Sequence, residues 1–308
     1  MIKRLPLLFT VSIIITGLTG ATGKPRSADE IINKYIKARG GYKKLKAIKT
    51  LRMTGTYQEG KNTFGTYIEW KRPWFRVVVV GVPDEFYREG FNGTSWEYSL
   101  PTKALKITEP SSAAGTATRR GAEFDESIID YRAKGHRVYF VGQERLAGKN
   151  VYHLRVTLRD GWAKDYYLDT ESYLIVALRK AMPLHATGPD IESLTMYEDY
   201  RSVAGVLYPH SFVERNTRTG AILNTLHWKE IEANVEIDDR QFDPPTVKSP
   251  EPRSAYKFAA LLSIPSLANE ESLSFSATAI TRDLTGLVVS QKSETGGRKR
   301  DSKQLYPF

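Results

Sequence analysis

The stretch VYHLRVTLRDGWAKDYYLDTESYLIVALRK, from Val151 to Lys180, decides the fold class of this chain. Apolar and polar residues alternate along it, and β-branched and aromatic residues are frequent, as is typical of half-buried strands. Two turn signals divide it, first at Asp160-Gly161 and then at the DTES run that ends at Ser172. Because short polar turns link successive strands, the stretch predicts an antiparallel meander of three strands.

The same pattern extends over most of the chain. Turn signals such as Asn92-Gly93 separate further β-rich runs. The predicted strands cover residues 51–57, 64–71, 74–80, 85–91, 95–99, 103–107, 137–142, 151–159, 162–168, 173–180, 192–201, 206–215 and 221–232. We therefore expect a mainly β (α+β) fold, in which about 11–13 antiparallel strands form a sheet curled over helices.

Two helices are predicted around this sheet. The SADE run from Ser27 to Glu30 is a capping box, apolar residues follow at helical spacing, and Gly40-Gly41 ends the pattern. A second helix is predicted around residues 122–134. The segment just before it, 111–120, is rich in Ser, Ala, Gly and Thr and is predicted to be a loop.

The two ends of the chain differ from this middle part. Residues 1–21 have a basic start and an apolar run too short for a comfortable membrane span, which predicts a secretory signal peptide, with an N-terminal anchor as the alternative. Residues 22–245 are predicted to form the folded domain, and 246–308 a Pro/Ser-rich linker and weakly ordered C-terminal tail. The absence of cysteine excludes lipidation at a lipobox cysteine and any disulfide framework.

The charge of the chain argues against a nucleic-acid partner. The formal net charge is +10, but the basic residues are spread along the sequence without a Lys/Arg block. We therefore interpret the charge as favouring solubility and transient contact with anionic membrane surfaces.

The sequence offers little for catalysis or for metal binding. There is no cysteine and no Gly-x-Ser-x-Gly, and the Ser-x-x-Lys spacing from Ser254 to Lys257 lacks partner motifs. The five histidines show no zinc spacing. A cluster of acids in the second predicted helix is interpreted as a solvated helix face and not as a metal site; it consists of Glu123, Asp125, Glu126 and Asp130. We expect no enzyme activity, no cofactor and no metal.

Apolar and aromatic residues on the predicted strands are the remaining candidates for function. They could simply fill the core, but a large curled sheet covered by few helices often encloses a cavity for an apolar ligand. The candidate ligand-binding residues are Leu51, Met53, Tyr57, Trp70, Phe75, Trp96, Tyr152, Leu154, Val156 and Leu158.

Several stretches of this sequence resemble one protein family. They are SADEIINKYIKARGGYKKLKAIKTLRMTGTY (27–57), FNGTSWEYSLP (91–101), FVGQERLAGKNVYHLRVTLRDGWAKDYYLDTESYLIVALRK (140–180), YEDYRSVAGVLYPHSFVERN (197–216) and NVEIDDRQFDPP (234–245). In their order of helix, Gly-Gly break, meander and closing strands they resemble the LolA/LolB-like outer-membrane lipoprotein carriers, in particular the outer-membrane lipoprotein-sorting proteins.

This resemblance implies an unclosed antiparallel β-barrel with helices as a lid and with acyl chains bound inside. The implied partners are lipid acyl chains or lipoproteins, and the implied location is the periplasm. It implies neither catalysis nor a cofactor. The same fold also serves as a sensor in envelope-stress regulation, so an envelope protein partner remains the alternative.

Overall fold

The computed structural model describes residues 27–73, 75–82, 85–100, 102–183 and 189–246. The predicted signal peptide and the predicted tail beyond Thr246 lie outside the described residues. Within the described part, no helix is long and apolar enough to cross a membrane.

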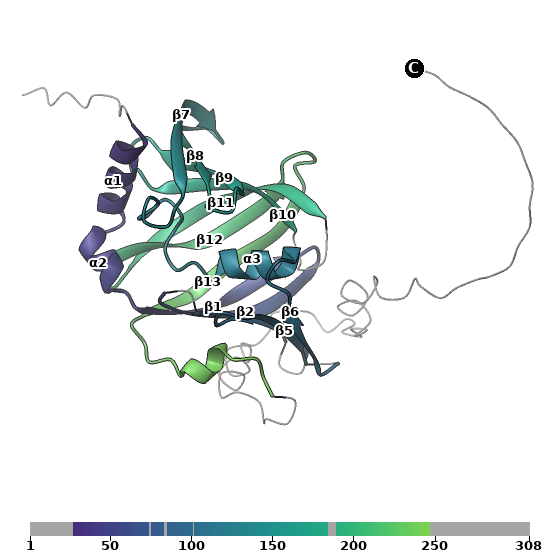
Figure 1. Cartoon of the computed structure of the whole chain (residues 1–308). Coiled ribbons are helices and arrows are strands. Elements are labelled where there is room, and N and C mark those ends of the chain that lie inside the picture. The colour runs from purple at the N-terminus through teal and green to yellow at the C-terminus, as the bar shows by residue number, and fades with distance from the viewer. Residues whose placement is uncertain (1–26, 74, 83–84, 101, 184–188, 247–308) are drawn as a thin grey trace, which may run out of the picture.

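Thirteen antiparallel strands form one sheet (Figure 1). They are β1 (Thr50–Glu59), β2 (Asn62–Lys71), β3 (Phe75–Val82), β4 (Glu85–Phe91), β5 (Ser95–Ser99), β6 (Ala104–Thr108), β7 (Arg137–Leu146), β8 (Lys149–Thr157), β9 (Ala163–Asp169), β10 (Ile175–Pro183), β11 (Asp190–Val203), β12 (Val206–Asn216) and β13 (Ile222–Ala233). Each predicted strand corresponds to one of these strands. The meander predicted from Val151 to Lys180 is β8, β9 and the start of β10.

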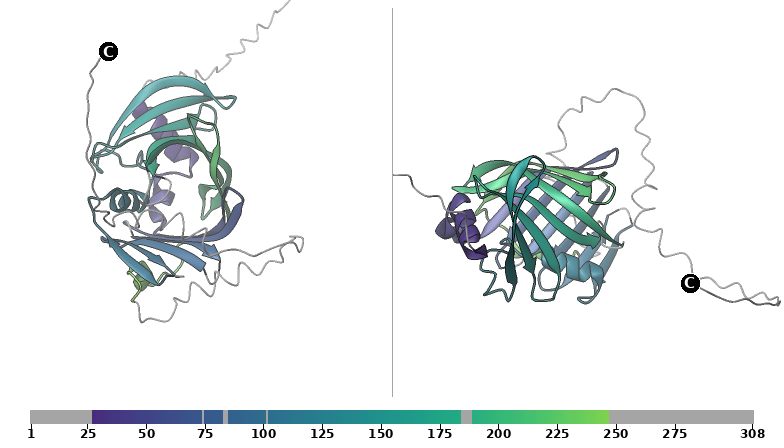
Figure 2. Two further views of the ribbon diagram at one scale, coloured as in Figure 1. Left: turned by 90° about the vertical axis from the view of Figure 1, so that its right-hand side faces the viewer. Right: turned by 90° about the horizontal axis from the view of Figure 1, so that it is seen from above.

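The order of the strands explains why the sheet is an unclosed barrel. The order is β6-β5-β4-β3-β2-β1-β13-β12-β11-β10-β9-β8-β7, so two meanders meet where β1 pairs with β13, and β6 and β7 are the two edges. The register of β1 and β13 shifts next to Gly55, where a Cβ atom would lie 2.0 Å from the backbone oxygen of His227. A bulge of this kind increases the bend of a sheet. Figure 2 shows the sheet curling so that its two halves face each other.

Helices α1 (Ala28–Ala38) and α2 (Tyr42–Ala47) cover one end of the curled sheet (Figure 1). The Ser27 side chain accepts a hydrogen bond from the Glu30 backbone at 3.2 Å, which confirms the predicted N-cap. After α1 the chain turns at Gly40, whose φ of +123° favours glycine and whose missing side chain leaves room for the backbone oxygen of Gly205. The end of α1 is therefore held against the turn between β11 and β12.

The second helix lies elsewhere than predicted. Helix α3 spans Ala113–Gly121, most of which was predicted to be a loop. Residues 122–134, predicted to be helical, form together with Gly135 a series of turns and bends. Ser112 caps α3 by accepting a hydrogen bond from the Gly115 backbone at 3.0 Å, and Arg119 and Arg120 lie in its last turn, where cations favour the helix dipole. We call residues 122–135 the closing segment.

Helix α3 bridges the gap between the two edges of the sheet (Figure 2, left). On one side the Ser95 hydroxyl of β5 donates to the Gly115 backbone oxygen at 3.2 Å. On the other side Arg120 donates to Asp160, in the turn between β8 and β9, at 3.0 Å, and its guanidinium carbon lies 4.5 Å from the centre of the Trp162 ring. The barrel is thus covered by a helix where its strands do not meet.

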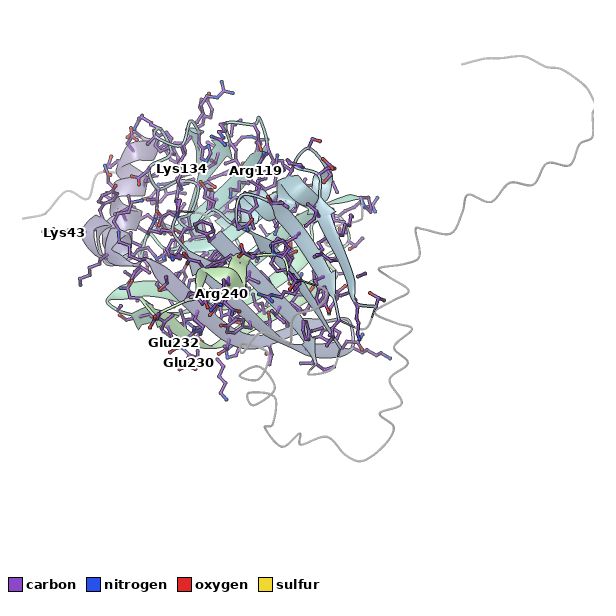
Figure 3. The ribbon with its side chains drawn as sticks, turned by 60° about the horizontal axis from the view of Figure 1, so that its bottom comes forward. Lys43, Arg119, Lys134, Glu230, Glu232 and Arg240 are labelled. Atoms are coloured by element: carbon purple, nitrogen blue, oxygen red, sulfur yellow. The ribbon has the colours of Figure 1, made fainter. Side chains whose placement is uncertain are left out.

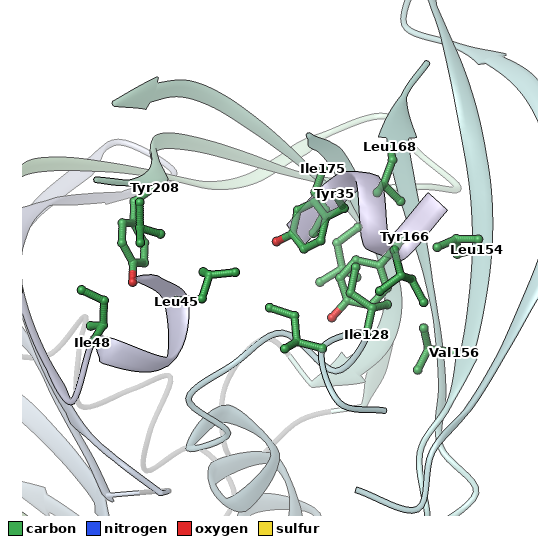
Figure 4. Packing of buried hydrophobic residues seen from close by; sticks show 14 of the residues in the cluster. Tyr35, Leu45, Ile48, Ile128, Leu154, Val156, Tyr166, Leu168, Ile175 and Tyr208 are labelled. Carbon is green, nitrogen blue, oxygen red and sulfur yellow. The ribbon is translucent and has the colours of Figure 1, made fainter. Parts of the chain in front are cut away.

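The main core lies on the inner face of the sheet, under α1, α2 and the closing segment (Figure 4). Ile31 and Tyr35 of α1 and Ile128 of the closing segment are fully buried there against residues of β8 and β9 such as Leu154. The two helices and the closing segment therefore close the inner face by packing apolar surface on it, which is the main stabilising contribution.

A separate, smaller core lies on the outer face. The 3-10 helix η1 (Asp239–Phe242) packs there, and Figure 3 shows it with Arg240 in front of the strands. Phe242 is buried against Val77 of β3 and Trp96 of β5, together with Ile237. The closing turn after β13 thus covers the outside of the β1–β6 half of the sheet.

Candidate functional site: the inner face and its closing segment

The structure brings seven of the ten predicted binding residues to the inner-face core. Cross-strand pairing places Leu51 opposite Trp70 on β1 and β2, and Tyr152 opposite Leu168 on β8 and β9. The seven residues are Leu51, Met53, Trp70, Tyr152, Leu154, Val156 and Leu158. All except Trp70 are buried, so these six are packed core residues, and whether a ligand reaches them stays a prediction.

Tyr57 lies farther along β1 on the same face. Its ring stacks on Phe64 of β2 with 6.5 Å between ring centres, and its hydroxyl donates to Glu59 at 2.8 Å. Burial and the nearby Glu59 carboxylate raise the pKa of the Tyr57 phenol above its usual value. The hydroxyl therefore stays protonated, and Tyr57 presents a polar group beside an aromatic surface.

Phe75 and Trp96 are not with the other eight residues. Both belong to the outer-face core, where the Trp96 indole donates to the backbone oxygen of Phe242 at 2.9 Å and the Phe75 and Phe242 rings lie 5.6 Å apart. The alternation of residues along a strand divides its side chains between the two faces of the sheet, but it does not show which face is the inner one. The sequence therefore could not separate these two residues from the others.

The inner face also carries large apolar side chains that are only partly buried. They come from strands on both sides of the β1–β13 junction, and the Tyr197 and Phe212 rings among them meet edge to face at 4.9 Å. The set consists of Trp70, Val80, Trp162, Tyr197, Phe212 and Leu226. Of these only Trp70 is among the ten predicted residues. An apolar surface left partly open on an inner face is a place where an apolar ligand can displace water.

A polar group interrupts this apolar lining between β10 and β13. The Glu214 carboxylate accepts hydrogen bonds from Ser193 at 2.6 Å and Asn224 at 2.9 Å, and lies 3.4 Å from the Lys180 ammonium. Burial opposes its charge, but Lys180 and these hydrogen bonds outweigh burial and lower the pKa of Glu214. The carboxylate is thus ionised and fully paired.

The closing segment is fixed by ion pairs to the α1–α2 end. Asp125, only 8% exposed, accepts two hydrogen bonds of 2.6 Å from the Arg72 guanidinium and one of 2.6 Å from Lys46. Glu126 pairs with Arg39, which is almost fully buried and also donates to the Tyr35 hydroxyl at 2.6 Å. These contacts join α2 and the residues that directly follow α1 and β2 to the closing segment.

The interpretation of this acidic cluster as a solvated helix face is therefore wrong. Glu123 is paired with Lys134 at 3.0 Å, and Asp130 with Lys46 at 2.5 Å, so each of the four carboxylates forms an ion pair with a basic side chain. Their local spacing fits a helix, but the partners of Asp125 and Glu126 lie 53 and 87 residues away in the sequence, where no local pattern can show them.

The lowered pKa values of these carboxyl groups predict that the folded protein loses stability in acid. Burial opposes the charge of Asp125, yet hydrogen bonds from Arg72 and Lys46 lower its pKa below the ordinary value, and the pKa of Glu123 is lowered in a similar way. A carboxyl whose pKa is lowered by folding stabilises the fold above its unfolded pKa of about 4, and this contribution is lost as the pH falls through the folded value. We expect the thermal midpoint to fall steeply below about pH 4. A midpoint independent of pH down to 3 would contradict these ion pairs.

No protein-family model and no curated protein matches this chain. Solved structures do match it in fold. A putative outer membrane lipoprotein-sorting protein domain from Vibrio parahaemolyticus has a TM-score of 0.49 and 13% identity over 70% of this chain and 95% of its own. A DUF1329 family protein from Desulfovibrio piger has a TM-score of 0.48 and 12% identity, over 70% of this chain and 96% of its own.

A LolA superfamily protein from Nitrosomonas europaea is also matched. Its TM-score is 0.47 and its identity 10%, over 70% of this chain and 97% of its own. At such identities the likeness concerns the arrangement of the strands and helices, and the properties of the inner face rest on this chain's own residues. The chain is similar to LolA-superfamily and lipoprotein-sorting structures in this arrangement.

Proposed function

We propose that this protein binds the acyl chain of a lipid or of a lipidated protein on the inner face of its curled sheet. We further propose that it acts as a carrier in the periplasm and catalyses no reaction. The observation that carries the proposal is the set of partly buried apolar side chains on the inner face, which faces a helix-covered gap between two unpaired edge strands.

The driving force for such binding is burial of hydrocarbon. Each methylene removed from water contributes about 0.8 kcal/mol, so ten methylenes contribute about 8 kcal/mol. Association costs roughly 4 to 15 kcal/mol in lost translational and rotational freedom. Binding therefore requires that the acyl chain also packs closely against the protein. Aromatic rings such as Tyr197 and Phe212 offer broad surfaces for such packing. α3 and the closing segment are the parts that would have to move for a chain to enter.

A substitution of Leu226 tests this proposal. Leu226 lies opposite Phe212 and Tyr57 on the inner face, so Leu226→Trp adds bulk where the acyl chain is expected. We expect it to weaken binding of the fluorescent fatty acid cis-parinaric acid to the delipidated full chain by about tenfold or more, a free-energy loss of about 1.4 kcal/mol. Fluorescence titration measures this loss.

The matched control is the next residue on β13. His227 is exposed and points to the opposite side of the strand, so His227→Trp adds the same bulk away from the inner face and is expected to leave the affinity unchanged. If the unmodified protein binds no parinaric acid at micromolar concentrations, or if both variants lose affinity equally, the proposal is wrong.

A further inference from the structure

Lys164 is a cation on the inner face. It belongs to β9, on the same side of the strand as Tyr166 and Leu168 of the inner core, and its cross-strand neighbours are Val156 and Lys180. Its ammonium lies 5.7 Å from the centre of the Trp162 ring and 5.4 Å from that of Tyr166. A positive charge over two aromatic rings is held in place, but rings alone do not supply a hydrogen-bond acceptor.

The acids near Lys164 are already paired with other groups. Glu123 accepts from Ser127 at 2.6 Å and pairs with Lys134 at 3.0 Å, while Glu126 pairs with Arg39. Among the described residues, none forms an ion pair or a hydrogen bond with the Lys164 ammonium. The neighbouring Lys180 differs, because Glu214 lies 3.4 Å from it.

The Lys164 side chain is packed among other residues but is not fully buried. Part of its surface remains accessible, yet burial lowers the pKa of its ammonium to about 8. At neutral pH it is still mostly protonated, because the Glu123 and Glu126 carboxylates favour its charge, although neither forms an ion pair or a hydrogen bond with it. A buried charge of this kind is costly unless it is paired, which points to a ligand as the source of the partner.

We propose that Lys164 binds the acidic head of an amphiphile whose acyl chain lies on the apolar inner face. The head is a single oxyanion group, a carboxylate or a phosphate monoester, which can accept the hydrogen bonds of the ammonium. This inference rests on the proposed function, since the chain of the ligand occupies the surface that carries Phe212 and Leu226. It adds a preference for free acids over neutral lipids.

The test compares two probes that differ only in the head: cis-parinaric acid and its methyl ester. We expect the full chain to bind the acid about tenfold more tightly than the ester, the scale of one charge-assisted hydrogen bond. Lys164→Met should abolish this preference by weakening only the acid, and Lys164→Arg should retain it. Binding of the ester by Lys164→Met shows at the same time that the variant is folded.

A cation elsewhere on the sheet serves as the control. Lys229 on β13 is exposed, so Lys229→Met removes the same charge from the outside and is expected to keep the preference for the acid. Displacement of the bound acid by dodecanoate and by dodecyl phosphate then distinguishes the two heads.

Three outcomes would overturn the proposal. Equal binding of acid and ester by the unmodified protein would show an apolar site without head recognition, and the proposed function would survive. Retention of the preference by Lys164→Met would assign it to another group. Failure to bind either probe would reject the acyl-binding function itself, and the role of Lys164 with it.

Discussion

Replacing Asp125 with asparagine is expected to lower the free energy of unfolding by roughly 3 to 5 kcal/mol. The asparagine side chain has nearly the same shape, so the loss is one of charge. Arg72 and Lys46, which are 19% and 29% exposed, would be left facing a neutral amide in a site that is largely shielded from water. Removing one partner of a buried ion pair costs more than the pair itself contributes, because the remaining charges stay desolvated.

Thermal melting and urea denaturation measure this effect. For a domain of this size the expected loss corresponds to a fall of roughly 10 °C in the thermal midpoint. Asp130→Asn is the matched control, because Asp130 also pairs with Lys46 but is 30% exposed. The Asp130→Asn variant is expected to lose no more than about 1 kcal/mol of unfolding free energy, as for other solvated ion pairs. Equal losses in both variants would mean that the closing segment is not fixed through Asp125.

The sheet could be predicted from the sequence because its signals are local. Strand alternation and turn residues act within a few positions, and the glycines of two predicted turns, Gly93 and Gly161, have φ values of +110° and +88° that favour glycine. The pairing of β1 with β13 joins residues far apart in the sequence, such as Met53 and Ile231. The order of the strands therefore follows from the structure, whereas the resemblance to a family implied only an unclosed antiparallel barrel.

The closing segment was mispredicted for a physical reason. Residues 122–135 have the acids and apolar residues of an amphipathic helix, yet Asp130 has a positive φ of 52° and Gly135 one of 74°, which interrupt a helix. Ion pairs to Arg39, Lys46 and Arg72 compensate for the loss of helical hydrogen bonds. Tertiary contacts therefore override the local preference in this segment.

The candidate site was predicted only in part, because burial and exposure cannot be separated by residue type. Leu154 and Phe212 are both apolar residues of the inner face, but Leu154 is fully buried whereas Phe212 is only partly buried. Lys164 gives no signal in the sequence at all, since it stands next to Asp165 in an alternating run and suggests an ordinary charged sheet surface. Its role becomes apparent only when the partners of Glu123 and Glu126 are known.

Replacing Trp96 with alanine is expected to cost roughly 3 to 5 kcal/mol of stability, the range for removal of a large buried aromatic side chain. The Trp96 side chain is fully buried, and the Arg88 guanidinium carbon lies 5.3 Å from its ring centre. The ring also lies so close to Gly90 that a Cβ atom there would be 2.2 Å from it. Its indole donates to Phe242, so the variant loses both the packing and the hydrogen bond that hold η1 on the outer face.

Trp162→Ala is the comparison that separates stability from binding. Trp162 is only partly buried, lies on the inner face beside Lys164, and donates to the Ala181 backbone oxygen at 2.9 Å. We expect it to cost less stability than Trp96→Ala but to weaken binding of parinaric acid severalfold, whereas Trp96→Ala should bind normally below its melting transition. Chemical denaturation and fluorescence titration of both variants give the two quantities. If Trp96→Ala lost affinity while remaining folded, the outer face would take part in binding and the division of the sheet into a structural outer face and a ligand-binding inner face would be wrong.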